Sequence, residues 1–286
     1  MLGAAFLLLA ASTAQSAESQ VTVEGHRETL QRRVRDFVTK ITAGSPDESL
    51  ELWRRPICPS VAGLSAQQGE AVLTRLSEIA RKAGAPLAGE HCEANLIIAV
   101  TPEPAKFIDQ WRARSQGRIF RDAAPMTVRH FIENARPVRV WYNDEIGDQH
   151  GTDVPALRTP GVAGVTGEPF EPVHTNSHAE DTRIELNGTK NLTFVMVIVD
   201  GHSIQHRSVG QVADYVSMVG LGRLDANLQN PEAPTILNLF AGAQEPQGLT
   251  EWDEAFLHAL YHTPQASRLQ RSAIARSIVE EVEAPR

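Results

Sequence analysis

The chain has 286 residues, of which 42% are hydrophobic and 22% charged, and its 27 basic and 35 acidic residues give a formal net charge of −8. This is ordinary globular composition with ample material for a sizeable core. The negative charge argues against nucleic acid or an anionic membrane surface as the main partner.

The N-terminus has the pattern of an export signal. The first 17 residues carry no charge, and residues 4–11 (AAFLLLAA) form an apolar run followed by small and polar residues. This pattern is typical of a secretory signal peptide, although no Lys or Arg precedes the apolar run. A membrane-spanning helix needs roughly 20 apolar residues, and no segment of the chain approaches that length. We therefore expect a signal peptide over residues 1–17, no membrane span, and a secreted, periplasmic mature chain.

Cys58 and Cys92 are the only two cysteines. An oxidising compartment favours a disulfide between them. The alternatives are a metal pair or a reactive thiol, but apart from His91 neither cysteine has a histidine at ligand spacing. The sequence predicts a Cys58–Cys92 disulfide.

The first part of the mature chain, residues 18–142, is predicted to consist of helices packed on a small sheet. Apolar residues at helical spacing predict helices near residues 28–42, 66–82, 107–111 and 127–134, and Gly84 closes the second of them. Two strands are predicted, a buried one at residues 95–100 (NLIIAV) and an alternating one at residues 137–142 (PVRVWY).

A long irregular stretch, residues 143–181, separates this part from the rest of the chain. It is rich in Gly, Pro, Asp and His and is far longer than an ordinary connection, so it is either functional or disordered. Residues 182–187, a turn at Asn187-Gly188 and residues 192–200 (LTFVMVIVD) are then predicted to form a β-hairpin. This hairpin opens the C-terminal part, residues 182–286, which is either separate or one domain with the N-terminal part.

The next predicted helix begins near residue 207 and has valines spaced three or four apart. Residues 213–223 (ADYVSMVGLGR) have the spacing of the segment HExxHxxGxxH of metzincin proteases, in which three His bind zinc and the Glu activates water. In this frame the ligand positions are Ala213, Ser217 and Arg223, the base position is Asp214, and only Gly220 is kept.

Other segments extend the likeness. Residues 234–240 (PTILNLF) resemble the segment after the active-site helix, and residues 249–261 (LTEWDEAFLHALY) resemble the element that closes several metzincin catalytic domains. A helix with Thr250 as N-cap and Asp253 as its capping-box partner explains the latter equally well. Residues 58–64 (CPSVAGL) and 92–96 (CEANL) also resemble an uncharacterised family of secreted bacterial proteins related to zincins. The resemblance implies an α+β fold whose C-terminal half is zincin-like, with a mixed sheet, a central helix and a degenerate zinc motif.

The substitutions argue against zinc at this helix. Ala213 has no donor atom, Ser217 is a poor ligand, and Arg223 would repel the cation. No cofactor is predicted. Asp214 is a weak catalytic candidate, because a lone Asp on a helix is usually a solvated charge.

Two His-x-x-x-His pairs are weaker metal candidates. They are His174 with His178 in the irregular stretch and His202 with His206 before the helix. Neither pair lies in a clearly helical pattern, so surface histidines are the main alternative.

These patterns predict a non-catalytic binding protein, a pseudo-metallopeptidase. Asp214, Ser217 and Arg223 would line a cleft for a peptide or protein, and Arg223 would bind a carboxylate through a bidentate pair. Two alternatives stay open. One is an active secreted hydrolase, metal-dependent through the His150–His206 region, and the other is a structural envelope component.

Overall fold

The computed structural model describes residues 12–45, 48–115, 120, 123–147, 188–225, 232–242, 245–265 and 267–284, with side chains from residue 27 onward. Residues 1–11 of the predicted signal peptide lie outside this part, and a helix begins at Ser12, inside the predicted peptide. In the part of the chain that is described, no helix combines the length and apolar character needed to cross a bilayer.

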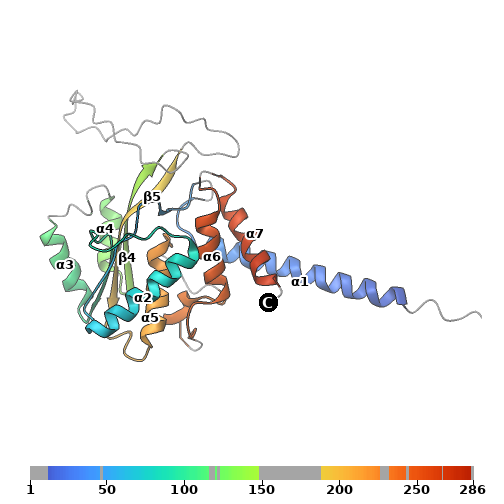
Figure 1. Cartoon of the computed structure of the whole chain (residues 1–286), viewed down its shortest axis with the longest axis horizontal. Helices are drawn as coiled ribbons and strands as arrows, with labels where there is room; N and C mark the ends of the chain where they lie inside the picture. Colours follow the sequence, from blue (N-terminus) through green and yellow to red (C-terminus); the bar gives the residue numbers. More distant parts are fainter. Residues whose placement is uncertain are drawn as a thin grey trace, which may run out of the picture.

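A five-stranded mixed sheet lies at the centre of the fold (Figure 1). Its strands are β1 (Leu52–Trp53), β2 (Pro59–Ala62), β3 (Leu96–Thr101), β4 (Val138–Gly147) and β5 (Thr189–Asp200). β2 runs parallel to β3, and β3 and β1 run parallel to β5. β4 pairs antiparallel with the opposite edge of β5. The predicted mixed α+β architecture is therefore confirmed, and β5 has strand partners on both of its edges.

The pairing of β5 corrects the predicted hairpin. Residues 192–200 were expected to pair with residues 182–187, which lie outside the described part of the chain. The structure instead pairs β5 with β4 on one edge and with β3 and β1 on the other. A strand has only two edges, so these pairings occupy the sites that the hairpin would have used. β4 also continues to Gly147, five residues beyond its predicted end, and so takes up the start of the stretch predicted to be irregular.

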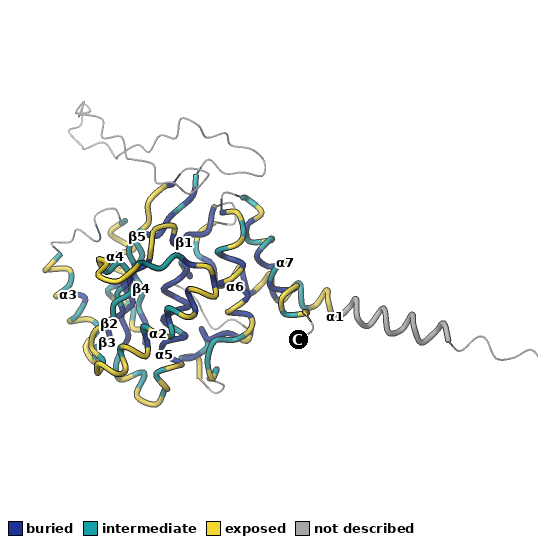
Figure 2. The backbone as a smooth tube through the Cα atoms, viewed as in Figure 1, coloured by how far each residue is buried: buried dark blue, intermediate teal, exposed yellow. Residues whose placement is uncertain are grey.

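One face of the sheet is covered by the helices α2 (Ala66–Ala83), α5 (Val209–Leu221) and α6 (Glu251–His262). α1 (Ser12–Ile41) and α7 (Gln270–Glu283) pack beside them, and buried residues of all five helices form one large core with the sheet. Figure 2 shows the buried parts of these helices in dark blue. This core joins residues on both sides of the irregular stretch, so the two predicted parts share one sheet and one core.

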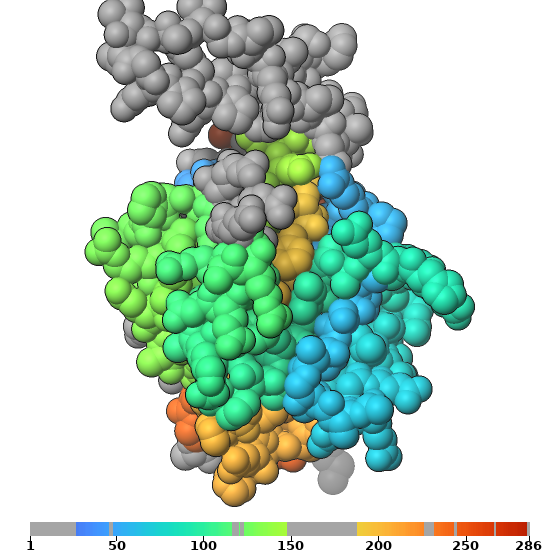
Figure 3. Space-filling view, turned by 90° about the vertical axis from the view of Figure 1, so that its left-hand side faces the viewer, coloured from blue at the N-terminus to red at the C-terminus, as the bar shows by residue number. Residues whose placement is uncertain are grey.

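The other face carries a smaller cover, α3 (Pro104–Arg114) and α4 (Pro125–Glu133). These helices form the green surface of this side in the space-filling view (Figure 3). A separate cluster lies beneath them. It is mainly aromatic and branched and includes Ile108, Phe120, Phe131, Trp141 and Ile198.

Short sequence patterns predicted the ends of several helices correctly. Gly84 adopts φ 81° at the end of α2, a left-handed conformation that favours glycine. Thr250 accepts a hydrogen bond from the Asp253 N–H, and the Asp253 carboxylate accepts one from the Thr250 N–H. The predicted capping box is therefore confirmed. The Cys58–Cys92 disulfide is also confirmed, and it joins the segments that precede β2 and β3.

Candidate functional site

α5 is the central helix of the predicted site. Ser208 caps it, and the Ser208 and Gln211 side chains each hydrogen-bond to the other's backbone N–H. Gly220 lies against Leu96 of β3, where an added Cβ would be 3.1 Å from the leucine side chain. α5 therefore packs closely on the sheet, and one of its faces is directed into the core.

Asp214 lies on this inward side. Its side chain is 5% exposed, and its carboxylate accepts hydrogen bonds from Arg75 Nε at 2.6 Å and from the Leu249 N–H at 2.7 Å. Gly248 adjoins it so closely that a Cβ there would lie 2.8 Å from Asp214 Oδ2. Asp214 thus connects α5 to α2 and to the start of α6, and its ion pair with Arg75 is structural.

Ser217 is fully buried, and its hydroxyl donates to the Ala213 carbonyl at 2.7 Å. Ala213 is 1% exposed. The expectation that Asp214, Ser217 and Arg223 line one cleft is therefore wrong for Asp214 and Ser217. Tertiary packing turned this face of α5 toward α2 and α6, and the sequence spacing alone did not contain that rotation.

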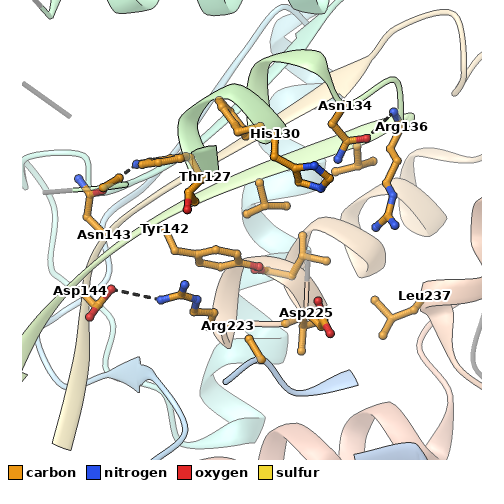
Figure 4. A pocket seen from close by; sticks show the side chains of 18 of the residues that line it. Thr127, His130, Asn134, Arg136, Tyr142, Asn143, Asp144, Arg223, Asp225 and Leu237 are labelled. Carbon is orange, nitrogen blue, oxygen red and sulfur yellow. Dashed lines mark hydrogen bonds and ion pairs between the residues drawn. The ribbon is translucent and has the colours of Figure 1, made fainter. Parts of the chain in front are cut away.

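A cavity of about 740 Å³ lies on another side of α5. It is bounded by α4, by nearly every residue from Pro137 to Glu145 along β4, by α5 and the segment that follows it, and by the 3-10 helix η2 (Ile236–Phe240). Thr127, His130 and Arg136 lie on one side of it and Arg223 and Asp225 on the other (Figure 4). We refer to this cavity as the β4 pocket.

Arg223 does line the β4 pocket, but its charge is already paired. Its Nη1 lies 2.5 Å from Glu51 Oε2 and 3.2 Å from Asp144 Oδ1. Burial lowers the pKa of Arg223, but the two carboxylates outweigh this effect and the net shift is upward. Burial raises the pKa of Glu51, which is 9% exposed, and the Arg223 charge opposes that rise only in part. Arg223 therefore joins β4 to the segment before β1.

Aromatic side chains form the inner wall of the pocket. The Tyr215 ring meets Phe240 edge-on with centroids 5.0 Å apart, and burial raises the pKa of Tyr215 to about 12. Tyr142 donates its hydroxyl hydrogen to the Val219 carbonyl at 2.8 Å, and burial raises its pKa as well. Both phenols are therefore neutral at ordinary pH. Val219 and Leu237 complete an apolar floor.

Within the described residues β4 has no strand partner on the edge away from β5, and this edge, called its free edge below, supplies backbone groups to the pocket. Asp200 N–H donates to the Pro137 carbonyl at 2.8 Å, and Val138 is in register with Val199. In an antiparallel pair alternate residues direct their N–H and C=O groups to the partner, so residues 137, 139, 141 and 143 face β5. The backbone groups of Val138, Val140 and Tyr142 consequently point away from β5, along the edge that the pocket follows.

The pocket is lined by residues that lie two positions after the predicted ligand positions Ala213, Ser217 and Arg223. Tyr215, Val219 and Asp225 are spaced as the three ligand positions, Gly222 stands at the glycine position, and the three all line the β4 pocket. Neither Tyr nor Val belongs to the usual zinc ligands. Within the described residues no three His, Cys, Asp or Glu side chains are placed to hold a metal ion.

The histidine candidates are distributed differently. His202 and His206 lie in turns before α5, and both are exposed. His174 and His178 lie outside the described residues, as does His150. His130 lines the pocket from α4, and in the described part of the chain no hydrogen bond joins it to a hydroxyl or carboxylate. The arrangement thus offers groups that bind a ligand, without a described nucleophile and base in contact.

Comparisons with protein-family models, curated proteins and solved structures find no match to this chain. Sequence patterns identified Arg223 but missed its partners Glu51 and Asp144. They also missed Tyr215, and the only available signal was the valine and tyrosine spacing of α5, which fits a core helix equally well.

Proposed function

We propose that this chain is a non-catalytic binding protein that takes an extended peptide segment along the free edge of β4. One observation carries the proposal: a ten-residue edge strand runs beside a cavity of about 740 Å³ with outward-facing backbone groups along it. An extended peptide that adds to such an edge gains affinity from main-chain hydrogen bonds and specificity from side-chain pockets.

The pocket chemistry indicates the kind of peptide. The aromatic and aliphatic floor formed by Tyr215, Val219, Leu237 and Phe240 suits an apolar side chain. A ligand carboxylate at Arg223 is no part of the proposal, because Glu51 and Asp144 already neutralise that guanidinium. A peptide with a large apolar residue opposite Val140 is the ligand that these contacts favour.

The proposal includes descent from a zincin-like protein that lost its metal site. Support comes from the placement of Tyr215, Val219 and Asp225 at ligand spacing along one pocket, together with the antiparallel strand that borders it. Location outside the cytoplasm, in the periplasm, is also proposed. It is supported by the disulfide and by the signal-like N-terminus.

The test removes one outward N–H from β4. Peptides that bind the purified chain would first be selected from a random library. Calorimetry would then measure their affinity for the unchanged chain and for the Val140→Pro variant. A proline is tolerated on an edge strand where its nitrogen faces away from the partner strand, so the sheet should survive. We expect Val140→Pro to weaken peptide binding at least tenfold. Val140→Ala, the matched control for loss of the side chain, should leave it within a few-fold.

Two results would overturn the proposal. Equal binding by Val140→Pro and the unchanged chain would show that the edge is not used. A dimer of the unchanged chain that Val140→Pro converts to a monomer would show that a second copy occupies the edge, and sedimentation would detect this. Circular dichroism of each variant verifies the fold.

A further inference from the structure

A second constellation lies outside the β4 pocket, at the end of α6. His258 and His262 are four residues apart and therefore share one face of the helix. Their ring centroids are 4.1 Å apart, with ring planes inclined by 31°. Both residues are exposed. The proposed function makes no use of this pair.

Hydrogen bonding defines the state of the His262 ring. Its Nδ1 lies 2.8 Å from the His258 carbonyl oxygen. A carbonyl oxygen only accepts hydrogen bonds, so Nδ1 carries the hydrogen and the neutral ring has its lone pair on Nε2. This is the tautomer that a metal ion requires of an imidazole whose other nitrogen is anchored.

A carboxylate accompanies the other ring. Glu281 of α7 places its Oε2 3.6 Å from His258 Nδ1, and both side chains are about half exposed. This distance is beyond a hydrogen bond, so Glu281 acts on the pair through its negative charge, which favours a cation there. Glu254, one turn before His258, is paired with Lys82 at 3.7 Å instead. Glu281 is therefore the carboxylate whose negative charge lies beside the histidine pair.

Gly84 provides space for the second ring. A Cβ at this position would lie 2.8 Å from His262 Cε1 and 3.3 Å from its Nε2. The absent side chain therefore lets the His262 ring lie at the end of α2. The pair is consequently held between three helices, α6 that bears it, α7 through Glu281, and α2 through Gly84.

We propose that His258 and His262 bind one divalent transition-metal ion through their Nε2 atoms, with the charge of Glu281 favouring the cation and water filling the remaining coordination sites. The rings must splay from their stacked arrangement to reach about 2.0–2.1 Å from an ion such as zinc, and both lie at the surface. Imidazole suits Cu²⁺, Ni²⁺ and Zn²⁺, and the general order of affinity places Cu²⁺ above the other two.

A second histidine pair with the same spacing, His202 and His206, serves as a control. This pair has the same spacing, but residues 201–206 form turns, and His202 Nδ1 lies 3.5 Å from the Gln205 amide nitrogen. Without a helix, four-residue spacing does not place two rings on one face. His202→Asn is therefore a matched control for the loss of one exposed imidazole.

The experiment measures Cu²⁺, Ni²⁺ and Zn²⁺ binding to the full, disulfide-bonded chain by calorimetry. We expect His258→Asn and His262→Asn each to weaken one Cu²⁺ site at least tenfold, and Glu281→Gln to weaken it by about two- to fivefold. His202→Asn should leave that site unchanged. Copper bound elsewhere on the chain is common to all variants and cancels in the comparison.

Two further readouts distinguish ligation from a change in folding. Because the substituted side chains are exposed, the metal-free unfolding midpoints should match that of the unchanged chain. Added Cu²⁺ should raise the midpoints of the unchanged chain and of His202→Asn by more than those of His258→Asn and His262→Asn. The Cu²⁺ spin-resonance spectrum should show coupling to two nitrogens, reduced to one in each single variant. Undiminished Cu²⁺ affinity in both His258→Asn and His262→Asn, or loss of the site in His202→Asn, would overturn the proposal.

Discussion

The two faces of the sheet differ in how firmly they are covered. The face under α2, α5 and α6 has a large core built from five helices, and the partly buried Asp214–Arg75 pair braces it. The face under α3 and α4 has a small aromatic cluster beneath two short helices. The β4 pocket lies at the edge of the sheet between the two covers, with α4 of the small cover as one wall and α5 of the large cover as the other. The pocket therefore depends on both faces, which differ in how much core stands behind them.

The largest expected effect compares one phenylalanine from each face. Phe256 is 1% exposed and packs edge-on against Phe37 with centroids 6.2 Å apart. Phe256→Ala should cost about 3–5 kcal/mol of unfolding free energy in urea titrations, because it leaves a cavity in a close-packed core. Phe131→Ala, in α4, should fall at the lower end of that range. A larger loss for Phe131→Ala would contradict the difference between the faces, and native-state hydrogen exchange should show α3 and α4 opening before α5.

The two edges of the sheet also differ, because a disulfide fixes the segment before the edge strand β2 and none fixes the edge strand β4. Replacing Cys58 and Cys92 by Ala opens a loop that spans 34 residues of sequence. For this length the chain-entropy model gives a loss of about 3–4 kcal/mol in unfolding free energy. Chemical denaturation measures it. A loss below 1 kcal/mol would mean that the β2 edge is held by its pairing with β3 instead.

The ion pair of the firmly covered face should have a moderate effect. Arg75→Ala leaves the Asp214 carboxylate, which is 5% exposed, with the Leu249 N–H as a remaining donor. Because the Arg75 side chain is one third exposed, water offsets part of the loss, and we expect about 1–2 kcal/mol. Arg81→Ala on the same helix, at an exposed position, should change stability by less than about 0.5 kcal/mol. Equal losses in the two variants would mean that the pair does not brace this face.

The smallest effect is a pH dependence at the pocket. The folded-state pKa of Glu51 is raised above its ordinary 4.5, so the folded state binds more protons than the unfolded state from about pH 4.5 upward to the folded pKa. Stability contributed by Glu51 is therefore present below this window and is lost as pH rises through it. Thermal melts across the window should show Glu51→Gln gaining stability relative to the unchanged chain as pH rises. If Glu51→Gln instead lost stability relative to the unchanged chain as pH rises, the attraction of Arg223 for the Glu51 carboxylate would outweigh the effect of burial.

Local signals in the sequence predicted much of the fold. Glycine at the end of α2 and the capping pair Thr250 and Asp253 placed helix ends, because each acts within a few residues. The apolar run of β3 was recognisable because a strand covered on both faces is apolar throughout. The two-residue β1 and the proline-containing β2 carry no such pattern.

The site was harder to predict because its contacts are long-range. Arg223 meets Glu51 across 172 residues of sequence, and nothing near either residue indicates the pairing. The zincin spacing was recognisable, but spacing does not determine which face of a helix packs inward. Asp214 and Ser217 face the core, whereas Tyr215 and Val219 face the pocket. The rotation of α5 about its own axis therefore determines which of its residues a ligand can reach.

The central position of β5 constrains the order of assembly during synthesis. β1, β3 and β4 all hydrogen-bond to β5, which ends at Asp200, while β2 and β3 can pair without it. As the chain emerges from the ribosome, three strands must therefore wait for residues 189–200 before the sheet forms, and contacts between distant segments make that step slow. A nascent chain therefore cannot close its sheet until Asp200 has been synthesised, and until then the unpaired edges of its earlier strands are open to pairing with other chains.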